Sequence, residues 1–222
     1  MRAKTSAEQR KLTALLKRDH TLFGGVLLGL DGYIIEIQAR ATEILRHPRP
    51  WRSAVSVTGM ARGSILESWD RISGAFAKFR IPEPEVSIVI NLTPADLPKE
   101  GALLDLPMAI IALQATGILP DIKEVWESKY ILVGEVGLHG EIRRVPGILS
   151  IALATEAGQN LIVPAGNERE CALITAAVGH EKCAISAVST LKEVIDFFGG
   201  KGELTKVLSQ RVQFEDLIPV SY

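Results

Sequence analysis

The chain has 222 residues, with 25 Lys and Arg against 26 Asp and Glu, which gives a formal net charge of -1 at pH 7. A hydrophobic fraction of 47% with 23% charged residues is typical of a globular protein that buries a core. The balanced charge excludes a global field that would hold phosphate backbones or anionic lipid, so any contact with nucleic acid must use a local patch.

The cysteines and the N-terminus restrict the class of protein further. Cys171 and Cys183 are too few for a disulfide framework and lack the paired spacing of a zinc site, so we interpret them as two buried thiols. The segment from Met1 to Arg18 has mixed charge, and no uncharged run approaches the ~18 residues needed to span a bilayer. We therefore expect a cytoplasmic protein with no membrane partner.

The first half of the chain indicates a hairpin followed by an amphipathic helix. Two β-rich runs, Gly24–Leu30 and Tyr33–Ala39, flank the dipeptide Asp31-Gly32, which favours a tight turn. The spacing of apolar residues between Ala61 and Phe79 predicts a helix packed on a sheet. The other elements expected in this half are a peripheral helix at Ser6–Arg18 and strands at Ala54–Thr58 and Val86–Leu92.

The second half indicates helices that alternate with strands. Asp105 is a candidate N-cap, and the apolar run that stops at Gly117 predicts a helix buried on all sides. Strands are expected at Tyr130–Val136, Glu141–Arg144, Leu161–Val163 and Ala184–Ala187, and helices at Gly147–Ala157 and after the capping-box pattern Thr190–Glu193. The predicted fold class is α/β (α+β), with one layered sheet and helices mainly on one face.

Three common kinds of active site lack their sequence signature. No glycine-rich loop followed by Lys-Ser/Thr occurs, so we expect no ATP hydrolysis and no bound cofactor in this chain. No metal site is expected, because the histidines are scattered at His20, His47, His139 and His180. A serine peptidase is a remote alternative, since no G-x-S-x-G motif accompanies Ser64, Ser68 and Ser73 on their predicted helix.

The loop Pro94–Gly101 precedes the predicted buried helix. The N-terminus of such a helix offers free amides and a positive dipole end, which favour an anion. In the other interpretation, Asp96, Lys99 and Glu100 only solvate the loop. The sequence leaves both interpretations open.

The segment Arg46–Arg52 contains two prolines and is expected to be an exposed loop. Its arginines could grip phosphate and its tryptophan could stack on a base, whereas the simpler interpretation is a solvated hairpin tip. The candidate nucleic-acid contacts are Arg46, Arg49, Trp51 and Arg52, together with Arg143 and Arg144.

Several passages resemble the N-terminal domain of Mg-chelatase-like ComM (YifB) proteins, which shares its fold with the Lon protease domain. They are Val57–Met60, Ser64–Phe79, Val86–Leu113, Gly134–Arg143 and Leu161–Pro164, and the likeness covers Gly24 to Phe198. The most specific element is the loop from Pro94 to Gly101. The family-motif residues are Pro94, Asp96, Lys99, Glu100, Gly101 and Asp105.

The resemblance implies that the catalytic pair of Lon is missing. The position of the Lon serine is occupied by Leu103, and the position of the Lon lysine by Leu149. A leucine can neither attack a carbonyl nor move a proton. We therefore expect a chain without peptidase activity, in which the former active site has been absorbed into the core.

The resemblance also implies how the chain is divided and what it does. It implies an N-terminal helical extension at 1–20, a Lon-protease-like ChlI/ComM domain at 21–200, and a linker or tail at 201–222 toward an absent AAA+ module. Full-length family members continue into a hexameric AAA+ ATPase associated with DNA branch migration in natural transformation. The implied function is a non-catalytic accessory domain that supports assembly or DNA-substrate engagement.

The implied partners are an AAA+ ATPase in cis or in trans, a second copy of the chain, or DNA. The alternative function is a stand-alone nucleic-acid-binding module that uses the Arg46–Arg52 loop.

Overall fold

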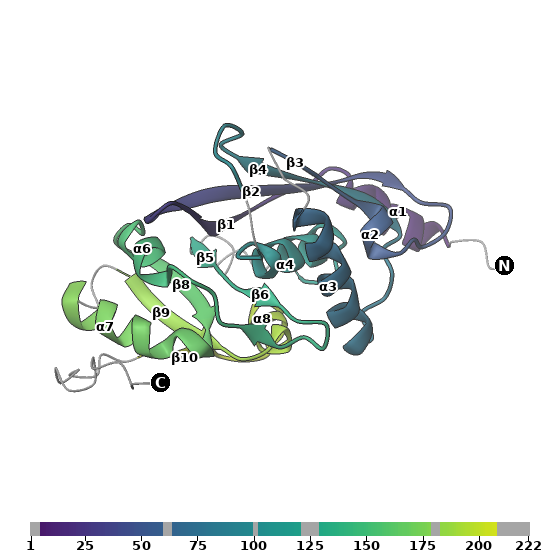
Figure 1. Cartoon of the computed structure of the whole chain (residues 1–222). Coiled ribbons are helices and arrows are strands. Elements are labelled where there is room, and N and C mark those ends of the chain that lie inside the picture. The colour runs from purple at the N-terminus through teal and green to yellow at the C-terminus, as the bar shows by residue number, and fades with distance from the viewer. Residues whose placement is uncertain (1–4, 60–63, 100–101, 121–128, 179–182, 208–222) are drawn as a thin grey trace.

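The computed structural model describes residues 5–59, 64–99, 102–120, 129–178 and 183–207. A mixed sheet runs through the molecule in the strand order β10-β9-β8-β5-β1-β2-β4-β3 (Figure 1). Its strands are β1 (Asp19–Leu28), β2 (Asp31–Ile44), β3 (Val55–Thr58), β4 (Val86–Thr93), β5 (Tyr130–Leu132), β8 (Gln159–Pro164), β9 (Cys183–Val188) and β10 (Thr205–Lys206).

The helices are α1 (Ser6–Leu15), α2 (Trp51–Ala54), α3 (Ser64–Lys78), α4 (Asp105–Ala115), α6 (Ile148–Leu153), α7 (Glu168–Val178) and α8 (Leu191–Phe198). The short strands β6 (Glu135–Val136) and β7 (Ile142–Arg143) pair in a separate two-stranded sheet. This mixed α/β architecture confirms the predicted fold class.

Strands β1 and β2 form the predicted hairpin, but its turn differs from the prediction. Cross-strand partners run from Asp19 opposite Arg40 to Leu28 opposite Asp31. The turn is therefore made by Gly29 and Leu30, and Gly29 supplies the positive φ of 64°. The prediction of a turn at Asp31-Gly32 is wrong, because both residues already belong to β2.

Helix α4 lies at the centre of the molecule, against β1, β2 and α3 (Figure 1). Every residue from Asp105 to Ala115 is buried, which confirms the prediction of a helix buried on all sides. The helix stops before Gly117, as predicted, and this glycine adopts a positive φ of 68°. Helix α3 is amphipathic as predicted, with Trp69, Ile72 and Phe76 buried.

The expected strand Tyr130–Val136 is divided into β5 and β6. Gly134 lies between them, outside the large sheet. Its N–H donates to the carbonyl of Leu103, and its carbonyl accepts from the N–H of Leu106. These two bonds attach the strand connection to the start of α4.

The parallel strands β5, β8 and β9 have helices on both faces. Leu132 and Ile162 face the cluster that contains α4 and α8. The alternate residues Ile131 and Leu161 face a second cluster formed with α6 and α7. In the remaining part of the sheet, α4 packs against β1, β2 and β4, and α6 packs against β1 and β2.

The two ends of the described chain both contact the folded core. Helix α1 buries Leu12 and Leu15, which join the larger core cluster. Strand β10, inside the segment predicted to be a tail, pairs with β9. The predicted cap of α8 is present, since the Thr190 hydroxyl accepts a hydrogen bond from the Glu193 N–H.

Candidate functional site

The loop after β4 is held by a buried lysine. Pro94 and Asp96 are exposed, whereas the Lys99 side chain has no exposed surface and its Nζ donates a hydrogen bond to the Pro94 carbonyl. Desolvation by the surrounding protein lowers the pKa of Lys99. Lys99 therefore closes the loop on itself, and only Asp96 fits the interpretation of a solvated loop. Glu100 and Gly101 lie outside the described residues.

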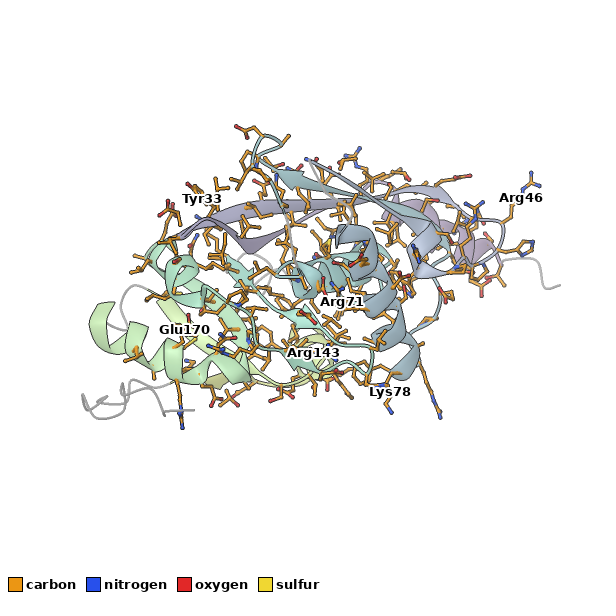
Figure 2. All side chains as sticks on the ribbon, viewed as in Figure 1. Tyr33, Arg46, Arg71, Lys78, Arg143 and Glu170 are labelled. Atoms are coloured by element: carbon orange, nitrogen blue, oxygen red, sulfur yellow. The ribbon has the colours of Figure 1, made fainter. Side chains whose placement is uncertain are left out.

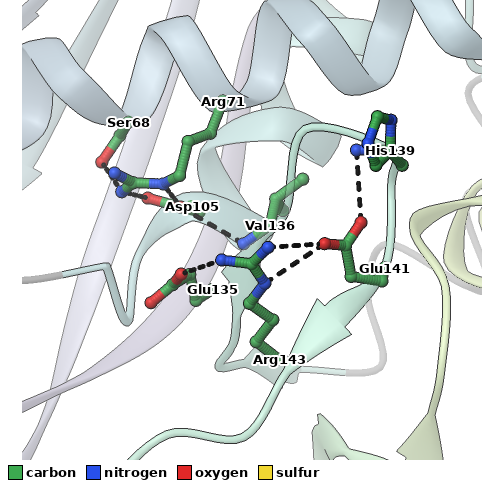
Figure 3. Close-up of polar contacts among 8 residues, drawn as sticks. All are labelled: Ser68, Arg71, Asp105, Glu135, Val136, His139, Glu141 and Arg143. Atoms are coloured by element: carbon green, nitrogen blue, oxygen red, sulfur yellow. Dashed lines mark hydrogen bonds and ion pairs between the residues drawn. The ribbon is translucent and has the colours of Figure 1, made fainter.

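Asp105 begins α4 but does not cap it, so its prediction as the N-cap is wrong. Leu104 occupies the cap position, and the buried Asp105 carboxylate turns toward α3. Its Oδ2 accepts from Arg71 Nε at 2.8 Å and its Oδ1 accepts from Arg71 Nη2 at 3.0 Å (Figure 3). The Val136 N–H adds a third bond to Oδ2 at 3.2 Å.

Burial and pairing act in opposite directions on this carboxylate. Burial raises the pKa of Asp105, and the hydrogen bond from Arg71 opposes that rise. The same bond raises the pKa of Arg71. Arg71 Nη2 also donates to the buried hydroxyl of Ser68 at 3.1 Å. This network was not predicted; the only signal in the sequence was a serine and an arginine three positions apart on one helix.

The N-terminus of α4 is occupied by the protein's own groups. The Leu106 N–H donates to the Gly134 carbonyl at 3.1 Å, and Pro107 has no N–H. The Asp105 carboxylate supplies a negative charge at the same end of the helix. The described residues therefore favour a closed helix start over the anion site that the sequence left open.

The two leucines at the positions of the Lon catalytic pair lie in different environments. Leu103 is buried in the smaller core cluster. Leu149, on α6, has 47% of its surface exposed, and its N–H donates to Glu170 Oε1 at 3.1 Å. The expectation that both positions were absorbed into the core is correct for Leu103 and wrong for Leu149, because α6 turns this residue toward solvent.

The serines of α3 are not arranged as nucleophiles. Ser68 is buried in the Arg71–Asp105 network, and Ser73 lies partly buried, just over one turn before the end of the helix. The side chain of Ser64 lies outside the described residues. Within the part of the chain that the structure describes, no His, Cys, Asp and Glu cluster could hold a metal ion. His180 is among the residues not described.

A second polar network lies beside the first, on β6 and β7. Arg143 pairs with Glu135 at 3.3 Å and with Glu141 at 2.7 Å, and the N–H of His139 donates to Glu141 (Figure 3). Arg144 lies 3.9 Å from Glu170. Two carboxylates therefore pair with Arg143, which disfavours this residue as a phosphate ligand, whereas Arg144 keeps most of its side chain exposed.

The structure divides the predicted nucleic-acid loop into two parts. The prediction that Trp51 stacks on a base is wrong, because this residue begins α2 and is only 1% exposed. Its ring contacts Phe76 edge-on, with a centroid separation of 4.7 Å. Arg52 pairs with Asp70 at 2.5 Å. Arg46 and Arg49 remain exposed, and Arg46 extends from one end of the molecule (Figure 2).

The cysteines are free and buried, as predicted. Burial raises the pKa of Cys171 to about 12, so this thiol stays protonated and unreactive at neutral pH. In the described chain, no helix has the length and apolar character to cross a membrane.

The fold and this site define a mixed α/β domain in which the expected hydrolytic positions are leucines and the polar groups around α4 are paired among themselves. Residues 46–167 match the family described as subunit ChlI of Mg-chelatase, which covers more than half of the chain. The chain belongs to this ChlI-type family, and its similarity to YifB and ComM places it with the ComM/YifB proteins.

Three relatives show the extent of the likeness. YifB of Salmonella typhimurium is 38% identical over 157 residues, which is 70% of this chain and 29% of YifB. YifB of Escherichia coli is 38% identical over 153 residues, 68% of this chain and 28% of YifB. Competence protein ComM of Haemophilus influenzae is 30% identical over 169 residues, 76% of this chain and 31% of ComM. The chain therefore spans less than a third of the length of these relatives.

Proposed function

We propose that the chain acts as a non-catalytic accessory domain of a Mg-chelatase-like, ComM-type ATPase, and that the ATPase module docks on it in cis or in trans. The apolar side chains at both positions of the Lon pair support a role without chemistry, since neither Leu103 nor Leu149 can transfer a proton. The proposed setting is the cytoplasm, where the free thiols Cys171 and Cys183 would persist without a disulfide.

The observation that carries this proposal is an exposed apolar surface where the β1–β2 turn meets α6. Leu30 is 90% exposed and Leu153 is 50% exposed; exposed apolar side chains that gather in one region mark a candidate interaction surface. We call this region the apolar tip surface; it consists of Leu28, Leu30, Leu149 and Leu153. Tyr33 lies at the same end of the molecule (Figure 2).

The apolar tip surface is held in place by close backbone packing. The Ser150 hydroxyl on α6 donates to the Leu30 carbonyl at 2.6 Å. Gly32 lies directly against the Ser150 backbone, and Gly25 lies against the Ile151 side chain. A surface fixed in this way loses little conformational entropy when a partner binds.

An exposed apolar surface on a rigid support is typical of a protein interface. The relatives contain more than twice as much chain outside the matched region as inside it. The part of a full-length family protein outside the matched region is therefore the proposed partner of the apolar tip surface.

A chimera tests the proposal. The matched region of Escherichia coli YifB is replaced by this chain, and assembly in the presence of ATP is measured by light scattering, together with ATP hydrolysis. We expect Leu30→Ser, Leu149→Ser and Leu153→Ser together to reduce assembly and hydrolysis. The control Leu138→Ser removes another exposed leucine, 54% exposed, on the β6–β7 hairpin and should leave both unchanged. Equal behaviour of the two variants would overturn the proposal.

A further inference from the structure

The described chain ends on the side of the sheet that carries α6. Its last residue, Val207, follows β10 and donates its N–H to the Ile185 carbonyl of β9. The Val207 side chain packs against the smaller core cluster, which also contains Ile148 and Ile151 of α6. Figure 1 shows β10, α7 and α6 at one end of the molecule. Residues 208–222 therefore continue from the same end of the molecule as the apolar tip surface.

A shallow groove extends the apolar tip surface between α6 and α7. Gly147 is the cap residue of α6, two positions before Leu149, and the Leu149 N–H donates to Glu170 Oε1 at 3.1 Å. Both Gly147 and Glu170 line the groove, so it is continuous with the apolar tip surface. We call the two together the tip-groove surface. The groove has a volume of about 580 Å³ and is lined by Arg144, Val145, Pro146, Gly147, Glu170 and Leu173.

Arg144 gives the groove an exposed positive charge. Glu170 is engaged by other groups, because its Oε1 accepts from Leu149 and its Oε2 accepts from Asn167 Nδ2 at 3.0 Å. The Arg144 guanidinium lies 3.9 Å from Glu170 Oε2, which is too long for a hydrogen bond, and its side chain is 69% exposed. A guanidinium has five N–H donors. Arg144 can therefore donate to a second carboxylate, beside the exposed leucines.

The sequence that follows β10 has a complementary composition. Residues 212–218 read Val-Gln-Phe-Glu-Asp-Leu-Ile, so four of the seven are apolar and two are acidic. They lie outside the described residues. Apolar side chains gain free energy when they are removed from water, and carboxylates form strong hydrogen bonds with a guanidinium. An apolar surface with one exposed arginine offers both kinds of contact.

The connection to Val207 is long enough for this contact. Helix α6 packs on β1 and β2. Four strand spacings separate β10 from β1, which amounts to ~19 Å. Leu217 comes ten positions after Val207 and can lie up to ~33 Å from it. A short tether also gives an effective concentration in the millimolar range, so even a modest intrinsic affinity suffices for docking.

We propose that residues 212–218 dock on the tip-groove surface of their own chain. The apolar side chains of the segment cover the exposed leucines, and an acid, Glu215 or Asp216, pairs with Arg144. A partner that uses this surface must then displace the segment. Regulation of ATPase docking by this displacement rests on the proposed function, whereas the docking of the segment does not.

Disulfide trapping in the full chain tests the proposal. One variant carries Leu153→Cys with Leu217→Cys, which joins the tip-groove surface to the segment. Cys171 and Cys183 are buried and should not take part. The chain is oxidised with copper–phenanthroline, and each disulfide is quantified by mass spectrometry without reduction. Thermal unfolding establishes that every variant is folded.

The matched control carries Leu138→Cys with Leu217→Cys. Leu138 is 54% exposed on the β6–β7 hairpin, close to 50% for Leu153. The hairpin is within reach of the segment, because the Gly140 carbonyl accepts the N–H of Leu191, three positions after β9 ends. We expect the Leu153 pair to form at least about tenfold faster than the control pair, because docking raises the local concentration of one thiol beside the other. Equal rates would overturn the proposal.

Two further changes separate the contacts. Arg144→Gln in the Leu153 pair should slow trapping by at least about threefold, because the carboxylate loses its partner. Lys78→Gln, which removes the same charge from an exposed position on α3, should leave the rate unchanged. Equal effects of these two changes would overturn the placement of the acids at Arg144.

The apolar contacts have their own measurement. In the chain without added cysteines, Phe214→Ser, Leu217→Ser and Ile218→Ser together should at least about double the binding of a hydrophobic dye, because the leucines are uncovered. Unchanged or weaker dye binding would contradict the proposal. All of these measurements use the chain without an ATPase. Their failure is therefore distinguishable from a failure of the proposed function, which the chimera tests.

Discussion

Arg71 on α3 and Asp105 on α4 form a two-pronged ion pair whose carboxylate has no contact with solvent. The same carboxylate accepts the Val136 N–H, so one side chain joins α3, α4 and β6. A buried charge of this kind is tolerated only while its partners remain in place. The pair therefore fixes how the central helix meets its neighbours.

Substitution of Arg71 by methionine is expected to destabilise the fold strongly. The change leaves the Asp105 carboxylate buried without its cation, which costs about 3–5 kcal/mol in comparable cases. The double variant Arg71→Met with Asp105→Leu should recover most of that stability, since no charge remains buried. Urea unfolding measures both free energies. Equal instability of the single and double variants would show that the pair is needed for its hydrogen bonds rather than for compensation of charge.

The cost of removing Arg71 should depend on pH. Burial raises the pKa of Asp105, so the folded state holds this proton more tightly than the unfolded chain does. A carboxyl group whose pKa is higher in the folded protein than in the unfolded chain stabilises the fold at a pH below its pKa in the unfolded chain. This stabilisation is lost as the pH rises through its pKa in the folded protein. Without Arg71 the rise in pKa is unopposed. The deficit of Arg71→Met relative to the wild type should therefore be smaller at about pH 4 than at about pH 7, and a deficit independent of pH would contradict this account.

The buried Lys99 amine should contribute stability that rises with pH, whereas the contribution of a carboxyl with a raised pKa falls. Desolvation lowers its pKa in the folded protein, so above neutral pH the unfolded chain binds more protons at this site than the folded chain does. Stability rises with pH in that range. The stability of the wild type relative to Lys99→Met should therefore increase between about pH 7 and pH 9.5. Urea midpoints at the two pH values provide the measurement, and a constant difference would mean that the Lys99 amine is solvated.

The pattern of apolar residues was sufficient to predict most helices and most strands, because burial follows the helical and strand periods directly. Helix α4 is the clearest case: an unbroken apolar run that stops at Gly117 has no stable place outside a core. The polar network around Asp105 could not be predicted in the same way. Arg71 and Asp105 are 34 positions apart, and their meeting depends on how two helices cross.

Trp51 illustrates the same limit at a predicted binding loop. Prolines and arginines around it indicated an exposed segment, but Pro50 starts a short helix that turns the indole inward against Phe76. Local sequence reports the preference of the backbone for a loop, whereas burial of one side chain is decided by the helix packed beneath it. The same limit explains Leu149, which was expected in the core but is exposed on α6.

The burial of Trp51 leads to a direct test. Trp51→Ala should destabilise the fold by about 3–5 kcal/mol, because it removes a fully buried aromatic ring and leaves a cavity. Arg49→Ala, two positions away and exposed, should change stability by less than about 0.5 kcal/mol. Thermal unfolding followed by circular dichroism compares the two. A small effect of Trp51→Ala would indicate that the loop is exposed in solution, as the sequence had suggested.

Gly32 provides the last prediction, at the contact between the hairpin and α6. A Cβ atom on Gly32 would overlap the backbone of Ser150 and Ile151, which cannot move aside as a flexible side chain can. Gly32→Ala is therefore expected to cost at least about 1–3 kcal/mol. It should also lift the turn from α6 and break the hydrogen bond from Ser150 to Leu30. Gly202→Ala is the matched control, since the added methyl group there meets only the Asp196 Cβ, at 3.9 Å. Urea unfolding measures the loss of stability, and faster amide exchange confined to α6 and the hairpin turn would show that the loss is local to this contact. If both variants unfold at the same urea concentration, the close packing that holds the apolar tip surface is absent in solution.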